Sequence, residues 1–334
     1  MGAWKEIVDY TVPSNTTSVD FTGLNITKDD FIKINTTIVN NDSSNRDLQL
    51  LINDSLNSKY QFIFANGTNI LANRPSDDLS NRFSRISANG TGSSFSHLRI
   101  SENGIANTWT NTTFRNNEDL FIYKIGQNYT QTVSTINKLT FQLDASNALG
   151  AGSRIQIYKL TAKKVADVVV TADSSQIDIT GLDIKKGDEY LLVSEFKRTN
   201  SFTLYLGANG DTNANNYRYQ RIRAGASSDG SDTSASRANV PAFIQTGSTG
   251  STEFNGLSYT HIKLSNIGAF TFQSYGISDV GGVGGDNRIP LYSWFVSSVS
   301  ENITNINQLN IFRGTNDIGA GSRFQLYKLY EGGN

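Results

Sequence analysis

The stretch Gly150-Ala-Gly-Ser-Arg-Ile-Gln-Ile-Tyr-Lys-Leu160 returns near the C-terminus as Gly319-Ala-Gly-Ser-Arg-Phe-Gln-Leu-Tyr-Lys-Leu329. Nine of the eleven positions are identical, and Ile155 and Ile157 are replaced by other large apolar residues in the second copy. Positions two apart lie on one face of a β-strand. The Gly-Ala-Gly-Ser start predicts a tight turn, because glycine adopts positive φ at no steric cost. Each copy is therefore predicted to be the final strand of a repeated module.

Other landmarks repeat in the same order along the chain. Val19-Asp-Phe-Thr-Gly-Leu-Asn-Ile26 matches Ile177-Asp-Ile-Thr-Gly-Leu-Asp-Ile184, and each predicts a strand that leads into a Thr-Gly turn. Phe95-Ser-His-Leu-Arg-Ile100 matches Tyr259-Thr-His-Ile-Lys-Leu264. Matches that keep their order over the whole chain predict a tandem duplication of one fold.

The apolar segments of both copies are short and rich in β-branched and aromatic residues, with Asn-Gly, Asp-Gly and Gly-Gly between them. This pattern predicts many short strands, and we find no long segment with helical periodicity. We predict an all-β chain of two tandem, homologous, jelly-roll-like β-sandwich domains, residues 3–161 and 164–330. The junction at 161–164 has no Pro/Gly/Ser run, so we expect the domains to abut.

Composition excludes several classes of function. The 334 residues carry a net charge of −1, which is not the strongly basic balance that nucleic-acid binding usually needs. There is no cysteine, hence no disulfide and no thiolate metal site. No apolar run approaches the roughly 20 residues of a membrane span, and the polar start does not resemble a secretory signal. We therefore expect a soluble protein made in the cytoplasm, without membrane insertion.

The sequence contains no recognisable catalytic or metal-binding motif. His97 and His261 are the two histidines, and their equivalent strand positions favour a structural role. Paired carboxylates such as Asp188-Glu189 lie in polar stretches that predict solvated turns. We predict no catalytic residue, no cofactor and no metal, although a glycosidase pair stays open because its carboxylates need be close only in space.

One polar segment, Asp211-Thr-Asn-Ala-Asn215, is similar to the start of a calcium-binding loop. Asn216 stands where such a loop needs glycine, and Ile222 stands where it needs a bidentate glutamate. An Asx-rich turn is therefore favoured.

Five residues are candidate interface or ligand contacts. Trp109, Tyr217 and Tyr219 lie in or beside predicted polar loops, where they could stack on sugars or cap the end of a sandwich core. Arg154 and Arg323 open the last strand of each module, and a salt bridge or an intersubunit contact is favoured over ligand binding.

The chain resembles a known class of virion protein. The features that carry the resemblance are the Thr-Gly-Leu segment, the stretch at 204–217 and the closing strand that begins Gly-Ala-Gly-Ser-Arg and ends Leu-Tyr. Together they are similar to small β-sandwich modules of minor structural proteins in tailed bacteriophages, which typically end with Ala-Gly-Ser-Arg-Phe-x-Leu-Tyr. The likeness covers both copies and is strongest in residues 164–330, since copy one has Asn53-Asp-Ser-Leu-Asn57 where copy two has the longer Asn-rich stretch. It names no catalytic residue.

The resemblance implies a non-enzymatic virion accessory protein, a capsid decoration or head-fibre component that contacts other virion proteins. We expect a homo-oligomer, a trimer being one form, with the two arginines or exposed strand edges at its contacts. The alternative is a tail or baseplate receptor-binding protein whose copy-two loops, 224–252 and 281–286, recognise host surface glycans. A glycan-degrading enzyme and a lectin-like bacterial surface protein are more distant alternatives.

Overall fold

A computed structural model describes residues 3–55, 58–66, 69–73, 82–102, 104–116, 119–198, 203–224, 242–245, 254–279, 291–299, 302–313 and 318–331. Within these ranges the regular structure is β-strand apart from one three-residue 3₁₀ turn, η1 (Ala214–Asn216). The prediction of an all-β chain is confirmed. The chain divides into two compact units, with the boundary along the chain between Thr161 and Ala162. Each unit is described by itself.

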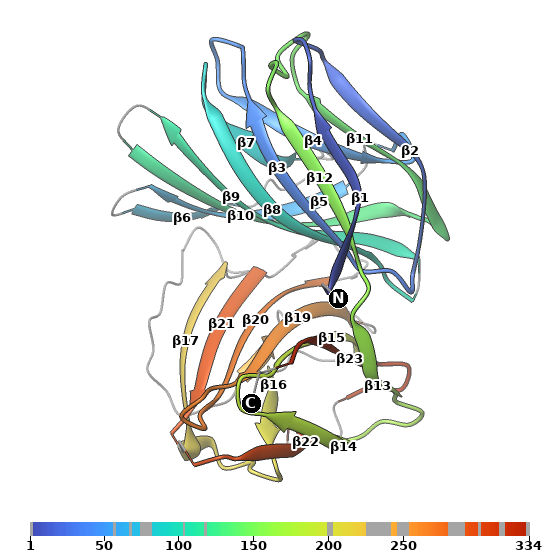
Figure 1. Ribbon diagram of the computed structural model, residues 1–334, viewed down its shortest axis with the longest axis vertical. Coiled ribbons are helices and arrows are strands. Elements are labelled where there is room, and N and C mark those ends of the chain that lie inside the picture. The colour runs from blue at the N-terminus through green and yellow to red at the C-terminus, as the bar shows by residue number, and fades with distance from the viewer. Residues whose placement is uncertain are drawn as a thin grey trace. The chain divides into compact units, whose positions relative to one another are not determined.

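The first unit, residues 4–161, is a sandwich of two antiparallel sheets (Figure 1). Its large sheet has the order β1-β12-β3-β8-β9-β10-β5-β6, and its small sheet has the order β2-β11-β4-β7. In chain order the strands are β1 (Trp4–Thr11), β2 (Ser18–Thr27), β3 (Ile32–Val39), β4 (Arg46–Ile52), β5 (Ser58–Asn66), β6 (Asn69–Asn73), β7 (Arg82–Ile86), β8 (Thr91–Ile100), β9 (Ile105–Asn116), β10 (Asp119–Thr132), β11 (Thr135–Leu143) and β12 (Arg154–Leu160).

The second unit begins at Ala162 and is also a two-sheet sandwich. Its large sheet has the order β13-β23-β15-β19-β20-β21-β17, and its small sheet has the order β14-β22-β16-β18. The strands are β13 (Lys163–Val169), β14 (Gln176–Lys185), β15 (Glu189–Arg198), β16 (Thr203–Ala208), β17 (Tyr217–Ala224), β18 (Ala242–Gln245), β19 (Phe254–Leu264), β20 (Phe270–Asp279), β21 (Leu291–Ser298), β22 (Asn305–Phe312) and β23 (Arg323–Tyr330).

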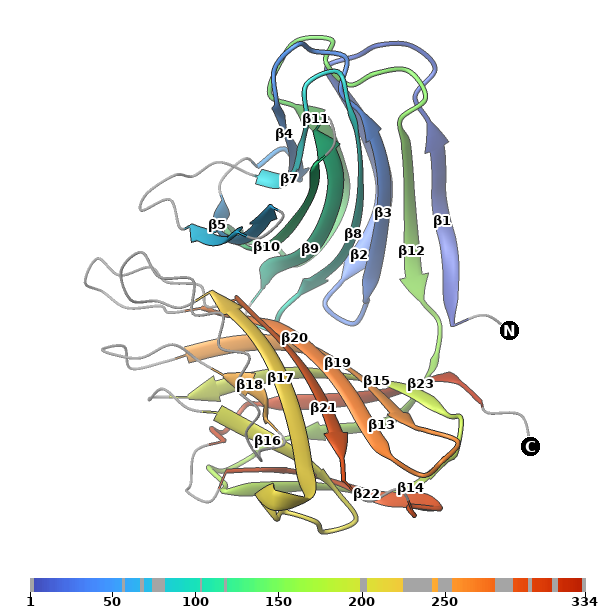
Figure 2. The ribbon, with the colours of Figure 1, turned by 90° about the vertical axis from the view of Figure 1, so that its left-hand side faces the viewer.

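The two strand orders correspond, except that the large sheet of the first unit has one more edge strand, β6, than the described strands of the second unit's large sheet. β1, β12 and β3 stand side by side in the large sheet of the first unit (Figure 2), as β13, β23 and β15 do in the second. A tandem duplication predicts this correspondence. In both units the early strands alternate between the two sheets, but the large sheets exceed the four strands per sheet of a simple jelly roll.

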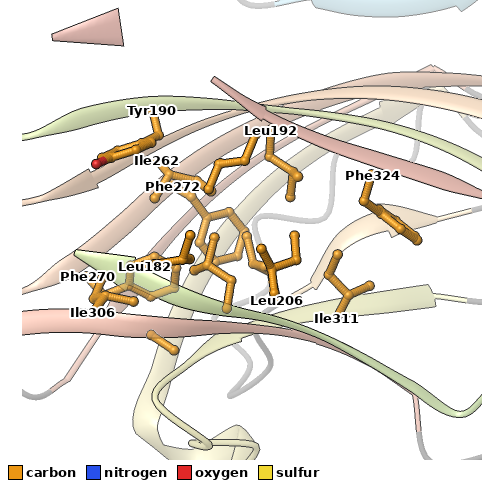
Figure 3. Packing of buried hydrophobic residues seen from close by; sticks show 14 of the residues in the cluster. Leu182, Tyr190, Leu192, Leu206, Ile262, Phe270, Phe272, Ile306, Ile311 and Phe324 are labelled. Carbon is orange, nitrogen blue, oxygen red and sulfur yellow. The ribbon is translucent and has the colours of Figure 1, made fainter. Parts of the chain in front are cut away.

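The core of each unit lies between its two sheets and follows the period-two alternation of the strands. In the second unit Leu206 of β16 and Ile311 of β22 point from the small sheet toward Leu192 of β15 and Phe272 of β20 (Figure 3). All four side chains are almost completely buried. Burial of this kind stabilises the fold by about 1.5–3 kcal/mol for each large apolar side chain.

The prediction of a turn at each of the two Thr-Gly pairs is wrong. Gly23 lies inside the continuous strand β2, and Gly181 lies inside β14. At both places the pairing register with the neighbouring strand shifts, and both glycines have positive φ, 71° and 72°. The segment is therefore an irregularity of β-bulge type, which needs the same residue types as a turn.

Candidate functional site

The repeated Gly-Ala-Gly-Ser segment connects three strands of the large sheet by hydrogen bonds, which in the first unit are β1, β3 and β12. In the first unit the N–H of Val39, at the end of β3, donates to Ser153 Oγ at 2.9 Å, and that hydroxyl donates to the carbonyl of Gly150 at 2.7 Å. After the end of β1, Val12 exchanges backbone hydrogen bonds with the segment, donating to Ser153 O and accepting from Gly152 N. The segment forms the predicted turn, with φ of 85° at Gly152.

The second unit repeats this arrangement with the same chemistry. Lys197 N–H donates to Ser322 Oγ at 2.9 Å, and that hydroxyl donates to Gly319 O at 2.7 Å. Val170 donates to Ser322 O and accepts from Gly321 N. We call each such turn, with its central serine, the serine clasp. Its function is structural, since its polar groups are satisfied within the fold.

Both candidate arginines follow a serine clasp and form a salt bridge to the neighbouring edge strand. Arg154 Nε donates to Asp9 Oδ1 at 2.8 Å, and a second guanidinium nitrogen contacts the other carboxylate oxygen. Arg323 donates to both oxygens of Asp167, at 2.8 and 2.7 Å. The hydrogen bond from Arg323 holds the pKa of Asp167 well below its usual range, and Arg154 lowers the pKa of Asp9 in the same way. The predicted salt bridges are present, while a role in intersubunit contacts stays a prediction.

The aromatic candidates do not gather at a ligand site. Trp109 on β9 is 2% exposed and Tyr217 on β17 is 1% exposed, so neither ring face is open for stacking on a sugar. Tyr217 is part of the second core, as the alternative interpretation for these residues predicted, and its hydroxyl donates to Asp211 O at 3.0 Å. Burial raises the pKa of Tyr217. The side chain of Tyr219 lies outside the described residues.

The two histidines have different surroundings although they occupy equivalent strands. The ring of His97 lies 4.9 Å from that of Phe31 and 4.7 Å from that of Phe95, and it is 1% exposed. His261 Nε2 lies 3.1 Å from Tyr275 Oη. Burial lowers the pKa of His261, which favours its neutral form.

The segment that is similar to a calcium loop is an Asx-rich turn. Asp211 Oδ1 accepts from Asn213 N at 3.0 Å, and Asn213 Oδ1 accepts from Asn215 N at 3.1 Å. Asn216 Nδ2 donates to both carboxylate oxygens of Asp211. Throughout the described ranges, no three His, Asp or Glu side chains cluster in a way that could hold a metal ion.

A groove of about 660 Å³ opens at one edge of the first sandwich. This edge groove lies where the edge strand of the large sheet, β1, and the edge strand of the small sheet, β2, leave the core incompletely covered. Its volume falls in the range of sites that hold a small molecule or a few side chains of a partner. The lining residues are Lys5, Ile7, Val8, Asp20, Phe21, Thr22, Gly23, Leu24, Ile26, Lys159 and Thr161.

The edge groove has an apolar floor and a charged rim. At the rim, Asp20 accepts from Thr140 at 2.6 Å and lies 2.9 Å from Lys138 Nζ, and the hydrogen bond from Thr140 lowers its pKa. Lys159 pairs with Asp30 at 2.6 Å. An ionised carboxylate that already has its partners is a poor general acid or base at neutral pH. The apolar lining residues Ile7, Val8, Phe21, Leu24 and Ile26 could contact apolar side chains of a partner.

Sequence reasoning missed the edge groove, because its two walls come from strands that belong to different sheets. The glycine that both copies share at positions 23 and 181 was not a signal specific to the groove, which is lined by Gly23 and not by Gly181. A side chain added at either glycine would meet no atom within 4 Å, which means that both positions face open space.

Comparisons with known proteins add no identification. No family model matches the chain, and no curated protein does. Among solved structures, the two C2 domains of extended-synaptotagmin 2 share 7% identity over 82% of this chain and 93% of that chain, with a TM-score of 0.13. The OccK5 (OpdH) structure of Pseudomonas aeruginosa shares 9% identity over 86% of this chain and 98% of that one, also with a TM-score of 0.13.

A di-domain ARO/CYC protein, StfQ from the steffimycin biosynthetic pathway, shares 6% identity over 80% of this chain and 84% of that chain, with a TM-score of 0.09. Similarities this low carry no conclusion about fold or function. In the parts of the chain that the structure describes, no helix is long and apolar enough to cross a membrane.

Proposed function

We propose that the chain is a non-enzymatic accessory protein of a tailed-phage virion, a capsid decoration or head-fibre component that works through protein–protein contacts. Its partners would be other virion proteins and further copies of the same chain. It would be made in the host cytoplasm and function in the assembled particle.

The observation that carries the proposal is the pair of serine clasps with their arginine salt bridges. Their residues are those of the Ala-Gly-Ser-Arg motif on which the resemblance to phage structural modules depends. In both units the serine and the arginine join the last strand to its neighbours through hydrogen bonds. The motif occurs once in each module and stiffens it through both the serine and the arginine. This supports a scaffold role better than a catalytic one.

The edge groove supports a role in protein contacts. Its apolar floor would accept a few apolar side chains, and among the described strands β1 and β2 beside it are edge strands with a neighbour on one side only. Exposed strand edges are common contact points between chains. We propose the edge groove as a virion contact of the first unit.

Receptor binding at the tail or baseplate is the second candidate function. Most of the copy-two loops that this alternative depends on, 224–252 and 281–286, lie outside the described residues. A different surface of the second unit, the outer face of its small sheet, favours glycan binding through Tyr205 and Phe312.

Mass spectrometry of gradient-purified virions tests the proposal. We expect the chain to co-purify with complete particles at a constant copy number, and to stay attached through washing at moderate salt. Detection in the infected-cell lysate but never in the particle would contradict it.

The edge groove is tested by obstructing it without disturbing the core. Thr22 is an exposed lining residue, so Thr22→Trp should fill the groove and reduce attachment to particles. Asn41→Trp places the same side chain at an exposed position of the same unit away from the groove, and it should attach normally. Equal attachment of both variants would remove the edge groove from the proposal while leaving the virion assignment intact.

A further inference from the structure

The outer face of the small sheet in the second unit carries two aromatic rings side by side. Tyr205 on β16 pairs with Phe312 on β22, and each alternates with a core residue. Leu206 and Ile311 point into the core (Figure 3), so their neighbours Tyr205 and Phe312 point to the opposite face. The ring centroids are 5.6 Å apart, the planes are tilted by 43°, and both residues are partly exposed.

A carboxylate and amides stand beside the two rings. Tyr205 and Phe312 form a row that runs across neighbouring strands of the sheet. Gln176 on β14 pairs with Phe312 and extends this row by one strand. In the next row Asp178 Oδ1 accepts from Gln176 Nε2 and from Asn310 Nδ2, both at 2.8 Å. Gln176 and Asp178 are exposed, and in the described part of the chain no ion pair joins Asp178 to a lysine or arginine.

The first unit provides an internal comparison, because the strand pairing identifies the equivalent positions. Gln49 and Gln142 occupy the places of Tyr205 and Phe312, and Gln142 Nε2 donates to Gln49 Oε1 at 2.7 Å. This amide pair is satisfied by itself and offers no aromatic surface.

The carboxylate also differs between the two units. Asp20, which stands where Asp178 does, accepts from Thr140 and is neutralised by Lys138 at 2.9 Å. The second unit has Asn310 and Gln308 at those two positions, so it keeps the carboxylate and loses the lysine. The second unit therefore has two aromatic rings and a carboxylate that is not paired with a lysine. At the same positions the first unit has an amide pair and an ion pair.

We infer that the Tyr205–Phe312 row is a binding site for a neutral polysaccharide. Aromatic faces present a large apolar surface against which the C–H groups of a sugar ring can pack, and the carboxylate and amide beside them offer acceptors and donors for its hydroxyl groups. The negative charge of Asp178 opposes the positive charge of Arg313, which interacts electrostatically with Tyr205, so the row has no excess positive charge that would favour acidic sugars. This glycan row is independent of the virion assignment, since the purified chain should bind in the absence of any particle.

Carbohydrate fits the glycan row better than a protein partner does. Two rings with two flanking polar side chains form a small site, whereas a stable protein interface buries about 800 Å² on each partner. A protein partner would also have to place a lysine or arginine against Asp178, because a buried charge without a counter-charge is costly.

The test transplants the first unit's amide pair into the second unit. The double variant Tyr205→Gln, Phe312→Gln reproduces a pair that the same sandwich already accommodates. Asp178→Asn keeps the shape of the site and removes its charge. Tyr330→Gln removes a ring that is 60% exposed elsewhere in the second unit and is the matched control.

Affinity electrophoresis of the full chain in gels that contain dextran, mannan, galactomannan or xylan measures binding, and alginate provides the acidic polymer. We expect at least one neutral polymer to retard the chain and alginate not to. The double variant should bind about tenfold more weakly or worse, Asp178→Asn should bind severalfold more weakly, and Tyr330→Gln should be unchanged.

Either of two results would overturn the inference. One is that none of the four neutral polymers retards the wild-type chain, and the other is that the double variant binds like the wild type. Thermal melting checks that the double variant is folded. If it is not, Asp178→Asn alone decides the question, because this exposed residue can be changed without disturbing the core.

Discussion

The hydroxyl of Ser153 accepts a hydrogen bond from the backbone N–H of Val39, a residue 114 positions earlier in the chain. The same bond joins Ser322 to Lys197 across 125 positions in the second unit. A hydroxyl is small enough to lie inside the turn, donate to the turn's first carbonyl and still accept from the neighbouring strand. The serine clasp thereby links the last strand of each unit to a strand near its beginning.

We predict that Ser153→Ala and Ser322→Ala each destabilise the fold by about 1–3 kcal/mol, because a strand N–H loses its partner in a buried place. Urea unfolding followed by circular dichroism measures the change. Ser14→Ala, at an exposed position, is the control and should stay within about 0.5 kcal/mol of the wild type. A serine clasp variant as stable as the control would contradict the structural role of the motif.

The salt bridge between Arg323 and Asp167 should make the free energy of unfolding depend on pH in the acidic range. Since the pKa of Asp167 is lowered in the folded chain, the contribution is complete above the unfolded value of about 4 and is lost as pH falls through the folded value. Asp167→Asn should therefore cost about 1 kcal/mol at pH 7 and clearly less at pH 2, where part of the contribution is already lost. Unfolding measured at both pH values tests this, and a cost independent of pH would show that the charge has no part in it.

Gly256 should not tolerate alanine. A Cβ at this position would overlap the ring of Phe196, a fully buried core residue. Gly256→Ala should cost about 1–3 kcal/mol through overpacking, and adding Phe196→Leu should recover part of the loss. Gly152→Ala has open space around the new Cβ and should show only the cost of positive φ, about 1 kcal/mol. Thermal melting of the three variants distinguishes steric overlap from backbone strain.

A buried pair of hydroxyls in the second unit allows a double-mutant cycle. Thr260 donates to Ser274 at 2.9 Å, and neither residue is exposed. Thr260→Val alone should cost about 1 kcal/mol, because it leaves the Ser274 hydroxyl without this partner, whereas Thr260→Val with Ser274→Ala should be closer to neutral. Additive losses in the cycle would mean that the two hydroxyls do not depend on each other.

The strand content and the repeat could be predicted from the sequence because both depend on local pattern. The alternation of apolar residues places Ile155 and Ile157 in the core, and their full burial agrees with it. The Gly-Ala-Gly-Ser segment forms the predicted turn for the predicted reason, a glycine at positive φ. Local pattern did not separate a turn from a strand irregularity at Gly23, since both need the same residue type.

The sites could not be predicted, because they depend on which strands become neighbours. Trp109 looked like a residue beside a loop, yet it lies on a central strand of the large sheet and is buried. Tyr205 and Phe312 are far apart in the chain and meet only through the pairing of β16 with β22. The alternation around Leu206 could have shown that Tyr205 faces outward, but not that Phe312 lies beside it.

The most direct test of the central claim is co-sedimentation of the purified full-length chain with empty capsids, with host cells examined in parallel. The virion proposal predicts saturable attachment to capsids, whether or not the glycan row also attaches the chain to cells. Attachment to cells alone would move the function to receptor recognition, with the glycan row as its first candidate contact. Attachment to neither would contradict a role in the particle.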